Sequence, residues 1–349
     1  MRARLCVLTA LCALSGAALA APVGWRADGS GHYPTEQAPT RWSADAAAWK
    51  APLSQWSNAS PVVAGDRVYV LAEPSDLLAF RARDGRRLWQ DQATYVQSLP
   101  PSERPQAQAR VEEVSRLEAA LAGVLEEQRK LLRTARKRGG DPAARTRARS
   151  RLAEVGARTE ALRAALESLG RYRLVTRGDT IGHTSATPVA DATGVYAAFA
   201  TGVVAAWDPK GGRRWTRWLG EPATPMRGNV DGHAASPLLV GGRLIVPLRL
   251  LHGLDPSTGA TVWRGAPWAD FGSPVAGRVG SEDAVLTPAG AAHRASDGAL
   301  LGRVAADLYY VGPVVDGPRA FWVGSTSSDP GAYAGVALAV DLTALQAGG

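Results

Sequence analysis

The sequence has almost no cysteine. Only Cys6 and Cys12 occur among 349 residues, and both lie within the first twenty. We predict that residues 1–20 are a signal peptide, because a positively charged start is followed by an apolar core and a small-x-small cleavage site. The mature chain would then hold no thiol. That excludes disulfides, cysteine nucleophiles, cysteine-bound zinc and haem attachment.

Long hydrophobic runs are also lacking. After the signal, no apolar run reaches the roughly 18–20 residues that a membrane span needs. Residues 195–207 come nearest, and Thr201 and Gly202 interrupt them. We therefore expect an exported protein without a transmembrane segment, which is periplasmic, envelope-associated or secreted.

Most of the chain has no excess of either charge. The net charge is +8, and residues 101–173 hold 17 Lys and Arg against 10 Asp and Glu. Outside this segment and the two signal arginines, there are 21 basic and 22 acidic residues. The basic character therefore belongs to one segment and says nothing about the remainder.

The basic segment has a helix-favouring composition, rich in Ala, Leu, Glu and Arg. Its apolar or small residues recur in alternating steps of three and four, which predicts a coiled-coil seam. They are Val114, Leu117, Leu121, Val124, Leu131 and Ala135 before the break at residues 139–142, and Leu152, Val155, Leu162, Leu166 and Leu169 after it. Gly139-Gly140 is expected to end the first helix, and Asp141-Pro142 to cap and begin the second. We predict an antiparallel helical hairpin with arms of about thirty residues, which would project roughly 40–45 Å.

The arginine-rich flank of this hairpin, residues 129–138 and 145–151, lies at its predicted tip. Such a run is typical of the solvated face of a coiled coil. It also suits contact with an acidic partner, such as an anionic lipid or an envelope polymer. Nucleic acid is disfavoured, because no aromatic residues interleave the charges and an exported protein rarely meets it.

The remainder of the chain is repetitive. One half-motif is a small residue and proline, then apolar residues and a hairpin-turn dipeptide. A β-branched or aromatic strand follows each copy. The copies begin at Ser60, Thr187, Ser236, Ser273 and Gly312.

A second half-motif follows each first one and reads small-x-Asp-x-x-Thr-Gly-x-x-x-Trp in its clearest copy, residues 253–263. Residues 79–89 and 206–215 are close variants, residues 292–302 have lost the tryptophan, and residues 339–341 begin a fifth copy. The recurring Asp208, Asp255 and Asp341 read as turn caps.

Together these motifs resemble the pyrroloquinoline-quinone-like (PQQ-like) repeat of β-propellers. The resemblance implies an all-β fold, a β-propeller in which each sheet covers its neighbour's apolar face. Counting the repeats gives about five blades, although members of the family commonly have seven or eight. The expected organisation is a signal peptide (1–20), an N-terminal propeller part (21–99), the helical insertion (100–174) and a C-terminal propeller part (175–349).

The resemblance also implies that Trp89, Trp215 and Trp263 dock neighbouring blades, each indole packing on the next blade and its N–H finding a backbone acceptor. The fifth repeat stops before its tryptophan strand, whereas Trp49 and the residues up to Leu53 form such a strand without a predecessor. We predict that these two parts meet and close a five-bladed ring, with an open or truncated arc as the rival.

Two functions follow from the resemblance. Quinoprotein dehydrogenases, which oxidise alcohols or sugars, use PQQ with Ca²⁺, paired neighbouring cysteines and a catalytic aspartate, and no such arrangement can be identified in this sequence. Outer-membrane assembly lipoprotein propellers instead recruit partners through loops and edges. We expect a non-catalytic binding or scaffold protein with no cofactor and no catalytic or metal residues. The chain's five histidines, His32, His183, His233, His252 and His293, are too dispersed to form a ligand motif.

Overall fold

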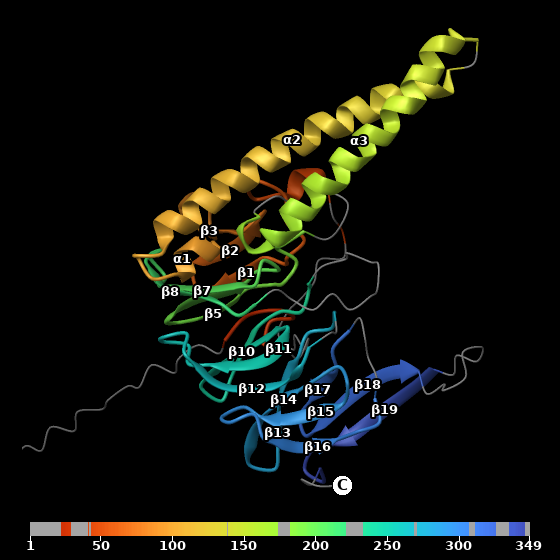
Figure 1. The fold of residues 1–349 in the computed structure, drawn as a ribbon. Coiled ribbons are helices and arrows are strands. Elements are labelled where there is room, and N and C mark those ends of the chain that lie inside the picture. Colours follow the sequence, from red (N-terminus) through yellow and green to blue (C-terminus); the bar gives the residue numbers. More distant parts are fainter. Residues whose placement is uncertain are drawn as a thin grey trace, which may run out of the picture.

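The computed structural model describes residues 22–28, 41, 43–137, 139–173, 182–220, 233–268, 271–306, 311–325 and 335–345. These residues form five antiparallel sheets that succeed one another along the chain, with a long helical pair above the first (Figure 1). The predicted signal peptide lies outside the described residues. No helix among the described residues is long and apolar enough to cross a membrane.

Each sheet follows the repeat, with its strands hydrogen-bonded in chain order. Sheet 1 contains β1 (Val62–Ala64), β2 (Arg67–Ala72), β3 (Asp76–Arg81) and β4 (Arg87–Gln92). Sheet 2 contains β5 (Val189–Asp191), β6 (Gly194–Ala198), β7 (Val203–Trp207) and β8 (Arg213–Trp218). Sheet 3 contains β9 (Leu238–Val240), β10 (Arg243–Leu248), β11 (Leu250–Leu254) and β12 (Thr261–Pro267). Sheet 4 contains β13 (Val275–Val279), β14 (Glu282–Leu286), β15 (Ala291–Arg294) and β16 (Leu300–Arg303). Sheet 5 has three described strands, β17 (Val314–Asp316), β18 (Arg319–Ser325) and β19 (Gly335–Asp341).

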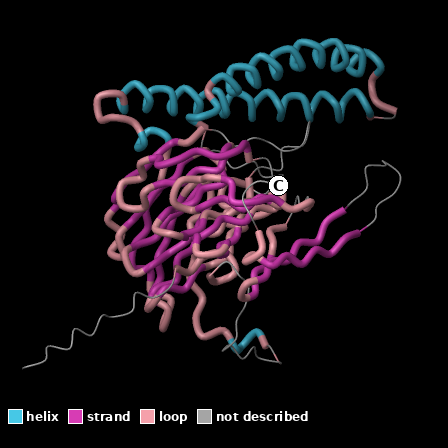
Figure 2. The backbone as a smooth tube through the Cα atoms, turned by 90° about the horizontal axis from the view of Figure 1, so that it is seen from below, coloured by secondary structure: helices cyan, strands magenta, loops and turns pink. Residues whose placement is uncertain are grey.

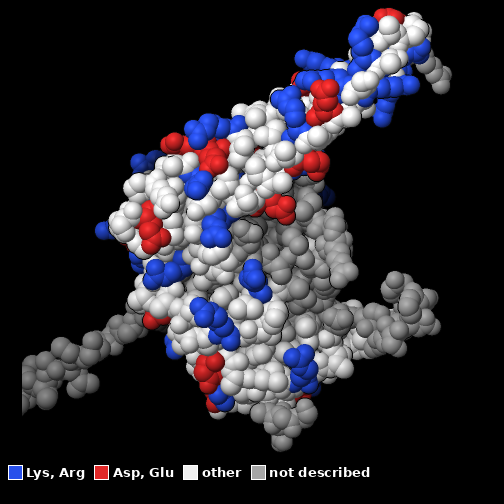
Figure 3. Space-filling view, in the orientation of Figure 1, with Lys and Arg blue, Asp and Glu red and all other residues white. Residues whose placement is uncertain are grey.

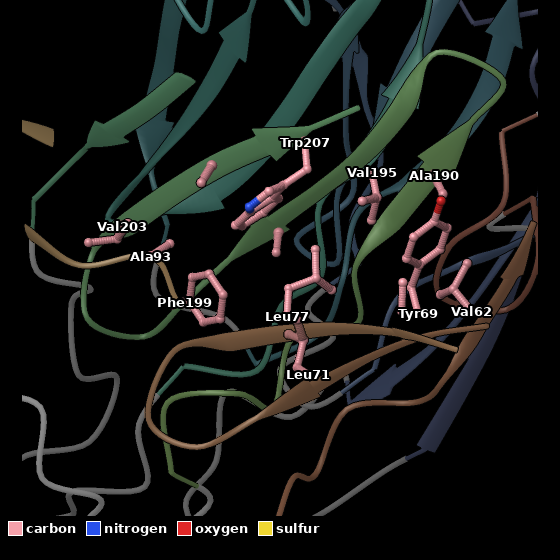
Figure 4. Close-up of a cluster of buried hydrophobic side chains, with 13 residues drawn as sticks. Val62, Tyr69, Leu71, Leu77, Ala93, Ala190, Val195, Phe199, Val203 and Trp207 are labelled. Carbon is pink, nitrogen blue, oxygen red and sulfur yellow. The ribbon is translucent and has the colours of Figure 1, made fainter. Parts of the chain in front are cut away.

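The sheets bury one another's apolar faces. β6 and β7 are buried at every position, because sheet 2 lies between sheets 1 and 3. Side chains alternate along a strand, so Val195 and Ala197 join the cluster shared with sheet 1, and Tyr196 joins the cluster shared with sheet 3. Figure 4 shows the first cluster, in which Leu71 and Leu77 of sheet 1 approach sheet 2.

Among the described residues, sheet 5 is covered on one face only. Trp322 and Ala320 are buried in a cluster with residues of sheet 4, whereas Phe321 and Val323 on the other face are exposed. Trp49 lies on sheet 1, where its ring stacks on Phe80. Among the described residues, no strand pairing joins residues 49–53 to β19, so closure of a five-bladed ring stays a prediction.

The helical segment contains α1 (Tyr95–Ser98), α2 (Arg104–Arg136), α3 (Pro142–Ser168) and the 3₁₀ turn η2 (Gly170–Tyr172), with a further turn, η1 (Ala44–Ala46), earlier in the chain. α2 and α3 lie side by side along their length in both views (Figures 1 and 2). The predicted cap is confirmed, because the Asp141 carboxylate accepts the backbone N–H groups of Ala143 and Ala144 at 2.9 and 3.2 Å. The predicted seam residues are buried or half-buried, with Val114, Val124, Val155 and Leu166 at most 3% exposed.

A segment near the start of the described residues pairs with β5, an edge strand of sheet 2. Val23 forms an isolated antiparallel bridge with Ala190 of β5, with N–H···O distances of 2.7 and 2.8 Å. Residues 22–28 are therefore tied to sheet 2.

Candidate interaction surface

The tryptophans of the repeat join consecutive sheets. The indole Nε1 of Trp89 donates to the carbonyl of Pro209 in sheet 2 at 3.1 Å, and Trp215 donates to Pro256 in sheet 3 at 3.0 Å. Trp263 donates to Ala295 in sheet 4 at 2.9 Å. The predicted docking role is therefore confirmed. Trp49 makes the equivalent contact, donating to the carbonyl of Ala82 in sheet 1 at 2.8 Å. Unlike the other three tryptophans, Trp49 does not lie in a described strand.

Each of these indoles lies over a turn glycine with positive φ. The glycines are Gly85 under Trp49, Gly211 under Trp89, Gly259 under Trp215 and Gly298 under Trp263. A Cβ atom at any of them would lie 2.5–2.6 Å from the tryptophan ring. Glycine at this turn therefore serves two purposes, the left-handed backbone and the close approach of the ring.

The small-Pro half-motif forms a second connection, a hydroxyl ladder between the first strands. The N–H of Ser60 donates to Thr187 Oγ1 at 3.3 Å, and the N–H of Thr187 to Ser236 Oγ at 2.9 Å. The N–H of Ser236 donates to Ser273 Oγ at 2.9 Å. In the fifth copy, Gly312 takes the position of the Ser or Thr. A Cβ atom there would lie 2.2 Å from the Ser273 carbonyl oxygen. Sequence reasoning found this motif but not the ladder.

A buried glutamate, Glu73, clamps sheet 1 to the segment that leads into sheet 2. Glu73 is 1% exposed. Its Oε1 accepts the backbone N–H groups of His183 and Thr184, both at 2.8 Å, and the Thr184 hydroxyl at 2.5 Å. The carboxylate thus satisfies three donors of a neighbouring segment. No repeat or motif in the sequence distinguishes Glu73, so sequence reasoning missed it.

The helical hairpin is anchored by an aromatic cluster at its base. The ring of Tyr95 on α1 makes edge contacts with Tyr172 at 5.3 Å and with Trp218 of β8 at 5.2 Å between centroids. The guanidinium of Arg171 lies 5.1 Å from the centroid of the Trp218 ring. Arg173 pairs with Glu118 of α2 at 2.9 Å. The base of the arm is thus held on sheets 1 and 2.

Two open hollows flank this base. One, of about 410 Å³, is lined by residues of α2, α3 and η2, among them Arg110, Glu113 and Tyr172. The other, of about 520 Å³, lies between α2 and sheets 1 and 2, where Arg213 pairs with Asp91 at 2.5 Å. Both are mainly polar and open to solvent, which suits protein contacts more than enclosure of a small molecule.

The far part of the hairpin is strongly basic. Figure 3 shows Lys and Arg side chains gathered around its distal end, whereas both signs mix nearer the sheets. Some of the basic groups are paired with acidic neighbours, such as Arg129 with Glu126 at 3.2 Å and Arg151 with Glu127 at 3.0 Å. Arg133, Arg136, Lys137 and Arg149 are exposed and make no ion pair with any described acidic residue. Those four charges are available to a partner.

The motif aspartates act within their own turns. Asp255 accepts the N–H groups of Ser257 and Thr258 at 2.7 and 3.1 Å, and the Ser257 hydroxyl lowers the pKa of its carboxyl. Asp208 accepts from Lys210 and Gly212, and Asp341 from Thr343. These contacts confirm that the three aspartates are structural turn residues.

His233, His252 and His293 are buried, and burial lowers the pKa of each, that of His233 to about 4. His32 lies outside the described residues. Among the described residues, no three His, Cys, Asp or Glu side chains come together in a metal-binding arrangement.

The described side chains do not fit a bound quinone with calcium. The cysteine pair that such enzymes place against the quinone has no counterpart after residue 20. The turn carboxylates of Asp208 and Asp255 already accept backbone N–H groups, and the indoles of Trp89, Trp215 and Trp263 are used in sheet docking.

Comparison with protein-family models gives one match. Residues 41–167 match the family model described as outer membrane protein assembly factor BamB, a span that includes sheet 1 and nearly all of the helical hairpin. The match covers 127 of the 349 residues, and it supports a PQQ-like repeat propeller family for this part of the chain. No match was found among curated proteins.

Solved structures give weaker similarities to this PQQ-like repeat protein. BamB from Moraxella catarrhalis has a TM-score of 0.41 and 19% identity, over 79% of this chain and 60% of that one. The quinohemoprotein alcohol dehydrogenase ADHIIG from Pseudomonas putida HK5 has a TM-score of 0.35 and 13% identity, over 83% of this chain and 40% of that one. The chain therefore spans at most three fifths of either structure's length, and neither similarity establishes a shared activity.

Proposed function

We propose that this PQQ-like repeat protein is an exported, non-catalytic binding or scaffold protein of the cell envelope. It would recruit partners through the helical hairpin and through the loops of its sheets. The observation that carries the proposal is the hairpin itself, a long, charged and solvent-exposed arm fixed at its base by Tyr95, Tyr172 and Trp218. The family match supports an envelope role at the level of the family.

The proposed location rests on the predicted signal peptide, residues 1–20. Cleavage there would release a thiol-free chain into the periplasm, the envelope or the medium. Because no cysteine would remain, the protein would fold in an oxidising compartment without forming disulfides.

We also propose that the five sheets are blades of one propeller, that residues 100–174 are an insertion in it, and that residues 49–53 supply the strand missing from sheet 5. If residues 49–53 form this fourth strand, hydrogen bonds to sheet 5 would protect their backbone N–H groups and slow their hydrogen exchange. Slow exchange there and in residues 335–341 is the expected result. Fast exchange in residues 49–53 would exclude ring closure.

Co-purification from envelope extract tests the proposed function. A tagged full-length chain would be compared with a variant in which a short Gly-Ser linker replaces residues 104–172. We expect the full chain to retain a defined set of proteins and the variant to lose those held by the hairpin. Identical protein sets from both chains would show that the arm recruits nothing.

The dehydrogenase that the repeat also implies can be tested on the same purified chain. An absorbance scan with calcium and the quinone, followed by a dye-reduction assay with alcohols and sugars, should show neither saturable uptake nor turnover. Saturable uptake coupled to dye reduction would replace the scaffold proposal with a quinoprotein dehydrogenase.

A further inference from the structure

The charge of the hairpin is divided sharply along its length. Residues 128–151, its distal part, contain ten Lys and Arg and one Asp. The proximal parts of the two helices, residues 104–127 and 152–168, contain five basic and eight acidic residues. A merely solvated coiled-coil surface has no need for such a division, because solubility is served equally well by mixed charge along the whole rod.

The distal basic groups surround the rod. Arg147 and Arg149 lie two residues apart on α3, which places them about 200° apart around the helix axis, and both are exposed. Arg133 and Arg136 add charge from the last turns of α2, and Lys137 follows its end. A partner that approaches the end of the rod therefore meets positive charge from every side.

The distal end of the hairpin, unlike its aromatic base, offers no apolar anchor for a shaped partner. None of the exposed large hydrophobic side chains found among the described residues lies on α2 or α3. The sequence also has no aromatic residue between Tyr95 and Tyr172. Protein interfaces depend on buried aromatic and apolar anchors, and single-stranded nucleic acid depends on aromatic stacking, so the distal end fits neither well.

The distal end is therefore suited to bind a surface that has many negative charges and no fixed shape. We propose that the distal end of the hairpin, residues 128–151, binds the anionic headgroups of a lipid bilayer end-on. Arginine and lysine suit phosphate groups through charge and hydrogen bonds, and a plane of phosphates can be met by the end of a rod in any rotation. The α2 arm of 33 residues is roughly 50 Å long at ~1.5 Å per residue. Its proximal part lies over the sheets and its distal part extends past them (Figures 1 and 2), so the bound end would lie beyond the body of the protein.

This inference rests on the proposed envelope role, but its test uses only purified components. The full chain would be sedimented with vesicles of phosphatidylcholine alone and of phosphatidylcholine mixed with phosphatidylglycerol. We expect binding only to the anionic vesicles. Binding should disappear as the salt is raised from about 0.1 M to about 1 M, where the screening length falls from ~10 Å to ~3 Å. Failure here would leave hairpin-dependent protein partners untouched, so the two proposals fail separately.

Matched variants locate the contact. The distal variant carries Arg133→Gln, Arg136→Gln, Lys137→Gln and Arg149→Gln, and the proximal control carries Arg110→Gln, Arg116→Gln, Arg158→Gln and Arg163→Gln. Each basic residue near an anionic surface contributes on the order of a fivefold change in affinity, so the distal variant should bind at least about tenfold more weakly. The control, with the same loss of charge, should bind within about threefold of the unaltered chain.

A conservative variant separates charge from fold. Arg133→Lys, Arg136→Lys and Arg149→Lys together keep the charge and should keep vesicle binding, and circular dichroism should show equal helix content in all variants. Equal weakening by the distal and proximal changes would overturn the proposal. So would equal binding to neutral vesicles, or tighter binding to a DNA duplex than to the anionic vesicles at the same salt concentration.

Discussion

At the residue scale, the indole–glycine contacts explain why the repeat keeps both Trp and Gly. The hydrogen bond from each indole fixes the ring direction, and the glycine allows the ring to lie against the backbone of the next sheet. The sequence pattern predicts this role, because a large apolar ring with one donor suits a seam between sheets. The partner carbonyls could not be predicted, since the consensus spans one repeat and the contact spans two.

A pair of glycine substitutions tests this dual role. Gly259 and Gly242 both have a φ of +69°, but a Cβ at Gly259 would lie 2.6 Å from the Trp215 ring, whereas none of the atoms around Gly242 lies within 4 Å. Gly242→Ala should cost about 1–2 kcal/mol through its left-handed backbone alone. Gly259→Ala should cost a further 1–3 kcal/mol or so from overpacking. Urea unfolding of both variants measures the difference, and equal losses would show that the ring contact contributes nothing.

The buried histidine His233 predicts an acid-sensitive stability. Burial lowers the pKa of its imidazole to about 4, below the value of about 6.5 in an unfolded chain. Between these values the unfolded state binds the extra proton, so stability is complete above about pH 6.5 and falls as the pH drops toward 4. The loss from this group is at most about 3 kcal/mol. Burial lowers the pKa of His252 and of His293 in the same direction, so their protonation at low pH also favours the unfolded chain.

Thermal unfolding between pH 4 and 7 of the parent and of His233→Gln measures the share of this residue. The variant should show a shallower dependence on pH across the ~4–6.5 interval. Parallel curves would mean that His233 does not remain neutral in the folded chain.

At the element scale, the hydroxyl ladder connects the first strands of neighbouring sheets. Among the described residues, these strands are not paired through backbone hydrogen bonds. Instead, a serine hydroxyl of the next sheet accepts the buried N–H group at the start of the strand. The sequence indicated the strand starts through their small-Pro pairs, but a hydroxyl at that place could also have been a solvent-facing turn residue. Only the burial of Thr187 and Ser236, both 2% exposed, distinguishes these two roles.

Removing one rung should be costly where the rung is buried. Ser236→Ala leaves the N–H of Thr187 without its acceptor, and a buried unsatisfied donor costs about 1–3 kcal/mol. Ser60→Ala is the matched control, because Ser60 is exposed and its ladder contact uses its backbone N–H. That change should stay within about 0.5 kcal/mol. Denaturant unfolding that ranks the two equally would contradict the ladder.

The helical pair shows which elements a sequence can specify on its own. Heptad spacing, the Gly-Gly stop and the Asp-Pro start are local signals, and α2, α3 and the Asp141 cap lie where these signals place them. The aromatic anchor at the base was not predicted, because Tyr95, Tyr172 and Trp218 are far apart in the sequence and meet only after the sheets form. The Glu73 clamp was missed for the same reason, since its donors lie 110 and 111 residues away.

At the scale of the whole molecule, the sheets and the arm are divided into two parts, each stabilised mainly by its own contacts. The sheets hold one another through buried faces, docked indoles and the ladder, whereas α2 and α3 bury their seam mainly against each other. The repeat count predicted five units, and five sheets are present among the described residues. How the first and last of them relate could not be derived from the repeat, because the same consensus builds rings of different size and open arcs alike.

This division predicts that the arm is dispensable for folding, which is the claim on which its proposed role as a separate binding device depends. The most direct measurement is cooperative unfolding, followed by near-ultraviolet circular dichroism, of the variant in which a short Gly-Ser linker replaces residues 104–172. The account predicts a folded β-sheet protein with an intact tryptophan signal and a single unfolding transition. A variant that loses the tryptophan signal, or that unfolds without a transition, would show that the sheets need the arm and would contradict the account.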